Sequence, residues 1–196
     1  MPLYRDPLNI SQLGPSWSPD GNWIAYFSTR FGRPAVLKTR VGSGQQPELV
    51  TMVSQLRPVR WSPRGDWIAV DDDRKLKLVS LDGKQHRVIS QREWHTFGWS
   101  GDAQAIYGIA IAENRRLRLG RIDATTGRET RVADLGPVPA ALQLGMYNGD
   151  FSYRGFSMHP DGKTFLTSVL RTKADIWLLQ GFDRRPNLLA RLWRRP

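Results

Sequence analysis

The fold is decided by Trp17-Ser18-Pro19-Asp20-Gly21-Asn22-Trp23-Ile24-Ala25, which returns 44 residues later as Trp61-Ser62-Pro63-Arg64-Gly65-Asp66-Trp67-Ile68-Ala69. These two copies differ only at their fourth and sixth positions. A weaker copy starts at Trp99-Ser100-Gly101-Asp102, and a fourth starts at Met158-His159-Pro160-Asp161-Gly162. Self-similarity at such a spacing is typical of proteins built from repeated structural units.

Each copy places a turn between two runs of strand-forming residues. In the turn, proline presets φ, aspartate bonds its own backbone, and glycine accepts a positive φ. Apolar, β-branched and aromatic residues then predict three strands after the turn. The second strands are expected at 23–27, 67–70, 105–111 and 165–169, the third at 35–41, 76–81, 117–122 and 176–179, and the fourth at 48–52, 87–90 and 129–133.

Four strands in a unit of about 40 residues predict an all-β propeller of four-stranded antiparallel blades. One domain is expected over 1–196. Its repeats are expected at about 14–52, 58–90, 95–133 and 152–182, with an insertion at 134–151 and an arginine-rich tail at 183–196. About four blades are present, either as a small closed ring or as the C-terminal part of a larger one. Because a blade cannot bury both faces alone, the repeated tryptophans are expected to lie between blades.

The repeat Trp-Ser-Pro-Asp-Gly-x-x-Ile-Ala-Tyr at 17–26 resembles the TolB-type, WD-like propeller repeat of bacteria. The last unit contains Gly155-Phe156-Ser157-Met158-His159-Pro160-Asp161-Gly162-Lys163 and then Asp175-Ile176-Trp177-Leu178-Leu179-Gln180-Gly181-Phe182. This unit is similar to the final blade of propellers at the C-termini of bacterial signalling proteins. In such proteins the propeller follows a kinase-like or winged-helix module. The resemblance therefore implies an N-terminal effector module as one partner of this domain.

Composition narrows the class of protein further. The chain has a formal net charge of +11, divided almost evenly as +5 over 1–98 and +6 over 99–196. This even spread favours a generally basic surface over a nucleic-acid site. No apolar run is long enough for a membrane-spanning helix, and the N-terminus has no signal-peptide core. Cysteine is absent, so the compartment stays open between the cytoplasm and the periplasm of a bacterium.

The sequence offers little sign of catalytic chemistry. His86, His95 and His159 show no spacing typical of a zinc site. The stretch 155–159 lacks the second glycine of a nucleophile elbow. Asp71-Asp72-Asp73 lacks the pattern of a calcium loop and is interpreted as a charged hairpin. We therefore expect no enzyme activity, no metal and no cofactor.

Two segments break the repeat. Segment 134–153 is rich in apolar and aromatic residues, and long loops on a rigid scaffold often carry binding function. The alternative is that it packs over the ring opening. Segment 183–196 fits a short helix with Leu188, Leu189, Leu192 and Trp193 on one side. From the first segment and its continuation we predict a binding wall made of Met146, Tyr147, Phe151, Tyr153 and Arg154.

Together these observations predict a non-catalytic domain that binds a protein or a small ligand at the loop face or channel. It is expected to be the sensor or interaction part of a bacterial signalling or envelope protein. Two alternatives stay open. One is the accessory propeller of a serine peptidase, and the other is anionic-polymer binding through surface arginines.

Overall fold

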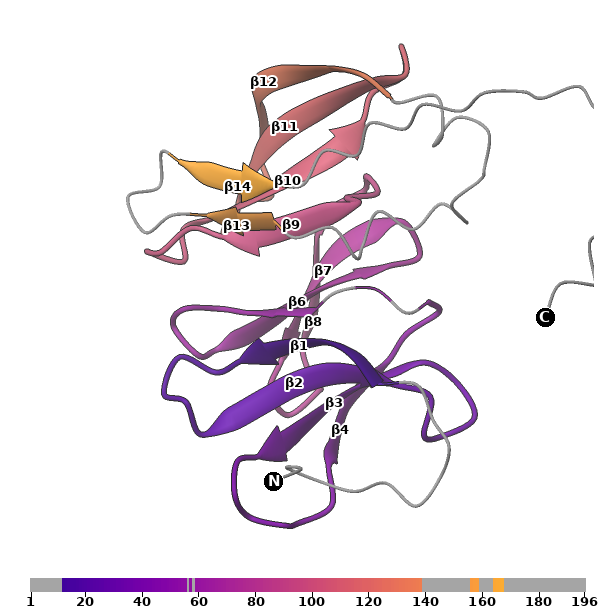
Figure 1. Ribbon diagram of the computed structural model, residues 1–196, viewed down its shortest axis with the longest axis vertical. Helices are drawn as coiled ribbons and strands as arrows, with labels where there is room; N and C mark the ends of the chain where they lie inside the picture. The colour runs from indigo at the N-terminus through magenta and orange to yellow at the C-terminus, as the bar shows by residue number, and fades with distance from the viewer. Residues whose placement is uncertain (1–11, 56, 58, 139–155, 159–163, 168–196) are drawn as a thin grey trace, which may run out of the picture.

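The computed structural model describes residues 12–55, 57, 59–138, 156–158 and 164–167. Every regular element in this part of the chain is a β-strand (Figure 1). The strands form three four-stranded antiparallel sheets and one two-stranded sheet, stacked one on the next along the molecule. This arrangement confirms the predicted all-β propeller built from four-stranded blades.

Within each sheet the strands follow chain order, so each blade is a simple meander. The first blade contains β1 (Gln12–Trp17), β2 (Trp23–Ser28), β3 (Ala35–Arg40) and β4 (Glu48–Met52). The second contains β5 (Val59–Trp61), β6 (Trp67–Asp72), β7 (Lys75–Ser80) and β8 (His86–Ser90). The third contains β9 (Thr96–Trp99), β10 (Ala105–Ile111), β11 (Arg116–Asp123) and β12 (Glu129–Pro137).

The fourth unit is described only in part, as β13 (Phe156–Met158) paired with β14 (Phe165–Thr167). β13 lies beside β9, the first strand of the third blade (Figure 1). The strand predicted at 176–179 and the tail 183–196 lie outside the described residues. The boundaries of the repeats and the choice between a closed and a larger ring stay predictions.

The turn that opens each blade is built by a serine. Ser18 Oγ bonds to Asp20 Oδ1 at 2.5 Å and accepts the backbone N–H of Trp23 at 2.9 Å. The third copy has neither the proline nor the glycine of this turn, yet it keeps the turn. Ala103 adopts a φ of +59° there, and its N–H donates to the Ser100 carbonyl at 3.0 Å. The serine and aspartate therefore specify this turn even without glycine.

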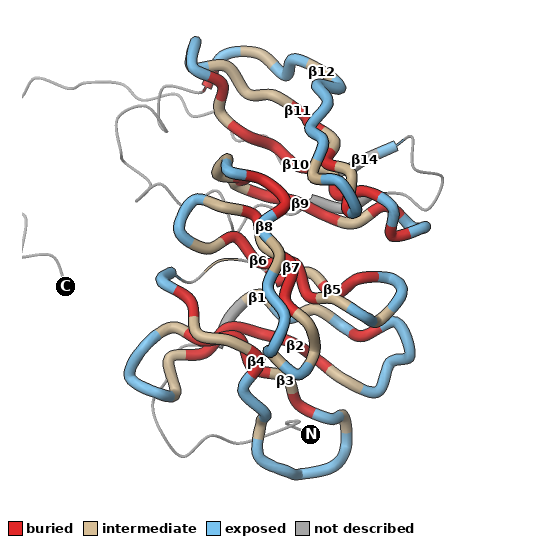
Figure 2. The backbone as a smooth tube through the Cα atoms, turned by 180° about the vertical axis from the view of Figure 1, so that it is seen from behind, coloured by how far each residue is buried: buried red, intermediate tan, exposed pale blue. Residues whose placement is uncertain are grey.

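The core lies between blades, as stacking requires. One cluster joins the first and second blades and contains Phe27, Trp61 and Ile68. Another joins the second and third blades and contains Leu78, Phe97 and Ile106, among others. Figure 2 shows burial concentrated along the strands and exposure at the outer turns.

The repeated tryptophans are buried to different extents. Trp61 is buried, and Trp23, Trp67 and Trp99 are half-buried against the inter-blade clusters. The expectation that the repeated tryptophans are mostly core residues does not hold for Trp17, which is 57% exposed. The difference has a physical reason, because Trp61 packs in the cluster that joins the first two blades, whereas no other blade of the described residues covers the Trp17 side of β1.

The meander also defines two ends of the stack. Turns 29–34, 73–74 and 112–115 lie at the same end as the links from each fourth strand into the next blade. We call this end the linker face. The described residues contain no helix that is long and apolar enough to span a membrane.

Candidate functional site

The link between the second and third blades, residues 91–95, carries a tryptophan that the repeat does not require. Trp94 is 3% exposed. Its ring lies over two adjacent glycines of the third blade, Gly108 and Gly120. A Cβ atom at these positions would come within 2.7 and 2.5 Å of the ring, so only glycine leaves room for it. The Trp94 ring therefore packs the link closely against the third blade.

Hydrogen bonds hold the same tryptophan from the other side. Its Nε1 donates to Ser90 Oγ at 2.8 Å, and Ser90 Oγ donates to Glu129 Oε1 at 2.5 Å. Arg92 Nε lies 3.4 Å from the second oxygen of Glu129. This chain of bonds ties β8, the link and β12 together. The link is thus a rigid part of the scaffold rather than a loose connection.

A buried carboxylate lies beneath the link. Asp71 Oδ2 accepts the backbone N–H of Trp94 at 3.1 Å, and the residue is only 2% exposed. Desolvation by burial raises its pKa to about 6, although the Trp94 N–H and the Arg57 charge oppose the shift. Residues 71–73 do belong to the β6–β7 hairpin, as expected, but Asp71 and Asp72 lie within strand β6 and Asp71 is buried. Asp73 and Arg74 do form the turn, both with positive φ.

Charged groups surround Glu93 in the link. Arg57 Nη2 contacts its Oε1 at 2.7 Å, and both side chains are largely buried. Arg74 Nε lies 3.4 Å from Oε2, and His95 Nδ1 lies 3.9 Å from Oε1. A buried carboxylate with an arginine partner at this distance is held in one orientation.

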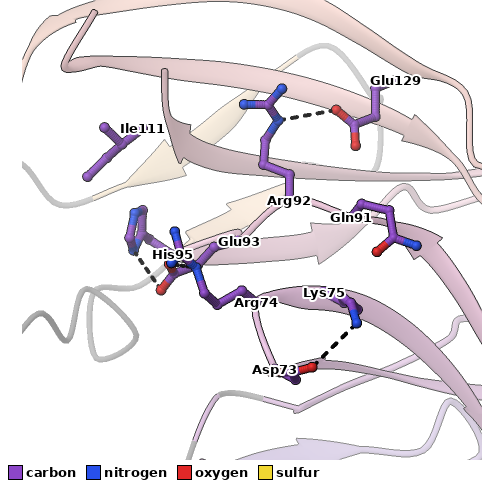
Figure 3. A pocket seen from close by; sticks show the side chains of 9 residues that line it. All are labelled: Asp73, Arg74, Lys75, Gln91, Arg92, Glu93, His95, Ile111 and Glu129. Carbon is purple, nitrogen blue, oxygen red and sulfur yellow. Dashed lines mark hydrogen bonds and ion pairs between the residues drawn. The ribbon is translucent and has the colours of Figure 1, made fainter. Parts of the chain in front are cut away.

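These groups form a pocket of about 750 Å³ on the linker face (Figure 3). The β6–β7 turn lies on one side, the link passes along another, and the third blade contributes the rest. The lining residues are Asp73, Arg74, Lys75, Gln91, Arg92, Glu93, His95, Ile111 and Glu129. Such a volume is in the range of ligand pockets in proteins.

The predicted binding wall of Met146, Tyr147, Phe151, Tyr153 and Arg154 lies outside the described residues, so it stays a prediction. The chain does enter that segment from the linker face. Val138 is the last described residue before it, and its N–H donates to the Arg115 carbonyl in the β10–β11 turn at 3.0 Å. The described chain therefore reaches Val138 at the same end of the stack as the pocket.

Sequence reasoning missed this pocket, although two signals point to it. Asp71 occupies the position that Phe27 and Ile109 hold in the other blades, so a charge replaces an apolar core residue there. Trp94 is a large aromatic residue in the link 91–95, whereas the preceding link, 53–58, contains no aromatic residue. Among the described residues, no cluster of three histidine, aspartate or glutamate side chains is placed to hold a metal ion.

Asp71→Asn is expected to stabilise the protein at neutral pH. The folded-state pKa of about 6 lies above the ordinary value of 3.8, so the folded state binds this proton more tightly. The unfolding free energy of the wild type should therefore fall as pH rises from about 4 to 6 and stay low above it. An asparagine oxygen can still accept the Trp94 N–H. The gain should be about 2–3 kcal/mol at pH 7.5.

Urea unfolding of the wild type and of Asp71→Asn at pH 4.5 and 7.5 measures this difference. Asp73→Asn, in the exposed turn two residues away, is the matched control and should unfold like the wild type at both values. A variant at Asp71 that is less stable than the wild type at pH 7.5 would show that its charged form is favoured by the fold.

Comparisons with known proteins identify the fold. No family model and no curated protein matches the chain. TolB from Acinetobacter baumannii is similar in structure, with 18% identity, a TM-score of 0.64, and 84% of this chain and 39% of that chain covered. The chain thus spans about 39% of the length of that TolB.

Two enzymes are also similar in structure. An oligogalacturonate lyase from Vibrio parahaemolyticus has 16% identity and a TM-score of 0.56, covering 66% of this chain and 42% of that one. A puromycin-hydrolyzing peptidase from Mycobacterium tuberculosis has 19% identity and a TM-score of 0.51, covering 67% and 22%. At such identities the likeness concerns the fold alone. The fold is a TolB-type β-propeller.

Proposed function

We propose that this chain is a non-catalytic binding domain that recognises a protein or small ligand at the linker face. The observation that carries the proposal is the pocket of about 750 Å³ between the second and third blades. We further propose that the domain is the interaction or sensor part of a bacterial signalling or envelope protein, as the sequence resemblance implies. An N-terminal effector module would then receive its signal.

Two physical arguments support recognition at this end. The faces of the blades pack against one another, so only the loops and the central channel are left for partners to bind. The pocket is also preformed, because Trp94, Ser90 and Glu129 fix the link that lines it. A preformed site spends less free energy on ordering when its ligand binds.

The lining chemistry supports binding rather than reaction. None of the nine lining residues has a hydroxyl or thiol group that could act as a nucleophile. Glu93 is engaged by Arg57 at 2.7 Å, and Glu129 is engaged by Ser90 at 2.5 Å. Carboxylate oxygens that already accept such bonds have less capacity left to accept a proton from a bound molecule.

The segment predicted from sequence fits the same proposal. Met146, Tyr147, Phe151, Tyr153 and Arg154 would form a second wall of the site, because the chain enters this segment at the linker face beside Arg115. Replacing residues 140–150 by a glycine-serine linker tests that part separately. Unchanged ligand capture with an unchanged melting temperature would remove this wall from the proposal.

The binding proposal is tested by selecting ligands that need the pocket. A displayed peptide library is panned against the wild type and then compared on Gln91→Trp. Gln91 is exposed on the pocket lining and makes no side-chain hydrogen bond among the described residues, so this change fills space without breaking contacts. Gln45→Trp, in an exposed loop of the first blade, is the matched control.

We expect selected peptides to bind the wild type and Gln45→Trp equally, and to bind Gln91→Trp at least tenfold more weakly. Peptides that bind all three proteins alike would place recognition elsewhere. A library that yields no binder would count against a peptide-binding function.

A second candidate is an accessory propeller of a serine peptidase, which the likeness to the puromycin-hydrolyzing peptidase favours. Stable association with a separate hydrolase domain in analytical ultracentrifugation would support it. The third candidate, anionic-polymer binding, draws on the net charge of +11. Retention on heparin that falls steeply with salt would support this candidate.

A further inference from the structure

The carboxylates and the arginines that line the pocket differ in how far their hydrogen-bonding capacity is already used within the protein. Its two partly buried carboxylates are already bonded inside the protein, Glu93 to Arg57 and Glu129 to Ser90. Both contacts are short, at 2.7 and 2.5 Å. These acceptors therefore have little capacity left for a cationic ligand.

The guanidinium groups on the lining, in contrast, still have N–H donors available for a ligand. Arg74 Nε lies 3.4 Å from Glu93 Oε2, and Arg92 Nε lies 3.4 Å from Glu129 Oε2, so both contacts are long. Among the described residues, the terminal Nη atoms of both groups make no hydrogen bond. The Arg74 side chain is 79% exposed. The planar guanidinium groups of Arg74 and Arg92 thus border the same pocket (Figure 3), and their Nη atoms can donate hydrogen bonds to a ligand.

The charges around the pocket favour a singly charged anion over a doubly charged one. Three acidic and three basic side chains line the pocket, and Arg57 adds a positive charge behind Glu93. The chain as a whole carries +11, which favours the approach of anions. A doubly charged phosphate would meet the three nearby carboxylates at a larger cost than a singly charged group. Ile111, on the same lining, offers an apolar contact beside the guanidinium groups.

We propose that this pocket binds a carboxylate that has an apolar group next to it, as at the C-terminus of a peptide, with Arg74 and Arg92 as the donors. This inference rests on the proposed binding function and names the chemistry of the ligand. Arginine forks match the geometry of a carboxylate, and such charge-assisted bonds are stronger than neutral ones.

The probe for this proposal is N-acetyl-leucine, which joins a carboxylate to an apolar side chain. Its neutral counterpart N-acetyl-leucinamide is the chemical control. Binding is followed by the arginine Nε–Hε resonances of the ¹⁵N-labelled full chain. We expect saturable shifts with N-acetyl-leucine, and none with the amide or with inorganic phosphate at equal concentration.

The matching variants are Arg74→Gln and Arg92→Gln, each expected to weaken binding of N-acetyl-leucine about tenfold. Arg115→Gln is the control, since Arg115 is exposed in the β10–β11 turn of the same face and does not line the pocket. The melting temperature of each variant shows whether it is folded. Equal loss in all three variants would mean that the effect is general surface charge.

The outcomes separate this inference from the binding function. Tighter binding of phosphate, or equal binding of the amide, overturns the carboxylate assignment. Displayed peptides that lose binding in Gln91→Trp but show no response to Arg74→Gln or Arg92→Gln leave the binding function intact and overturn the inference alone.

Discussion

Trp94→Ala is expected to lower the free energy of unfolding by about 3–5 kcal/mol, the range for removing a large buried aromatic side chain. The ring fills the space over Gly108 and Gly120, and neither glycine has a side chain that could fill the resulting cavity. The loss also leaves Ser90 without the Nε1 donor. Urea unfolding followed by far-ultraviolet circular dichroism measures the change.

Two variants sharpen this test. Trp17→Ala is the matched control, because its side chain is 57% exposed and its removal should cost little. Trp94→Phe should give an intermediate loss, since it keeps part of the ring packing but loses the bond to Ser90 Oγ. If Trp94→Ala unfolded at the same urea concentration as Trp17→Ala, the packing of Trp94 against the third blade would not contribute to the free energy of unfolding.

Trp61→Ala is expected to cost about as much, roughly 3–5 kcal/mol. Trp61 is buried in the cluster that joins the first two blades, beside Phe27 and Ile68. Its backbone N–H donates to Ser16 Oγ at 2.9 Å, which adds a contact between their first strands. Truncating the side chain therefore opens a cavity at the inter-blade contact.

Thermal unfolding with Trp17→Ala as the control measures this second change. The two residues occupy equivalent places in the repeat, so the comparison isolates the effect of burial. Should Trp61→Ala melt like the wild type and lose only ligand binding, Trp61 would have a role in ligand stacking rather than in the core.

The sequence predicted the blades because the repeat encodes local structure. The strand expected at 105–111 coincides with β10, and that at 67–70 lies within β6. The third copy kept its turn with alanine in place of glycine, since Ser100 and Asp102 supply the same hydrogen bonds as the serine and aspartate of the first copy. Trp17 shows the limit of this reasoning, as a repeat gives equal residues to blades with unequal neighbours.

The pocket could not be predicted in this way. Its lining comes from segments near 74, 92, 111 and 129, which meet only when the second and third blades are stacked. A repeat assigns each residue to a place within its own blade and gives no direct measure of the space between links. Asp71 and Trp94 break the pattern in sequence, but their contact at 3.1 Å is visible only in three dimensions.

The most direct test of the central claim, that ligands bind in the pocket between the second and third blades, is the methyl resonance of Ile111. Ile111 lines this pocket, whereas Ile24 lies buried in the first blade. Protein labelled at isoleucine methyl groups is titrated with a peptide selected on the wild type. We expect the Ile111 resonance to shift in proportion to the bound fraction while that of Ile24 stays in place. Saturable binding that leaves Ile111 unmoved would contradict the claim.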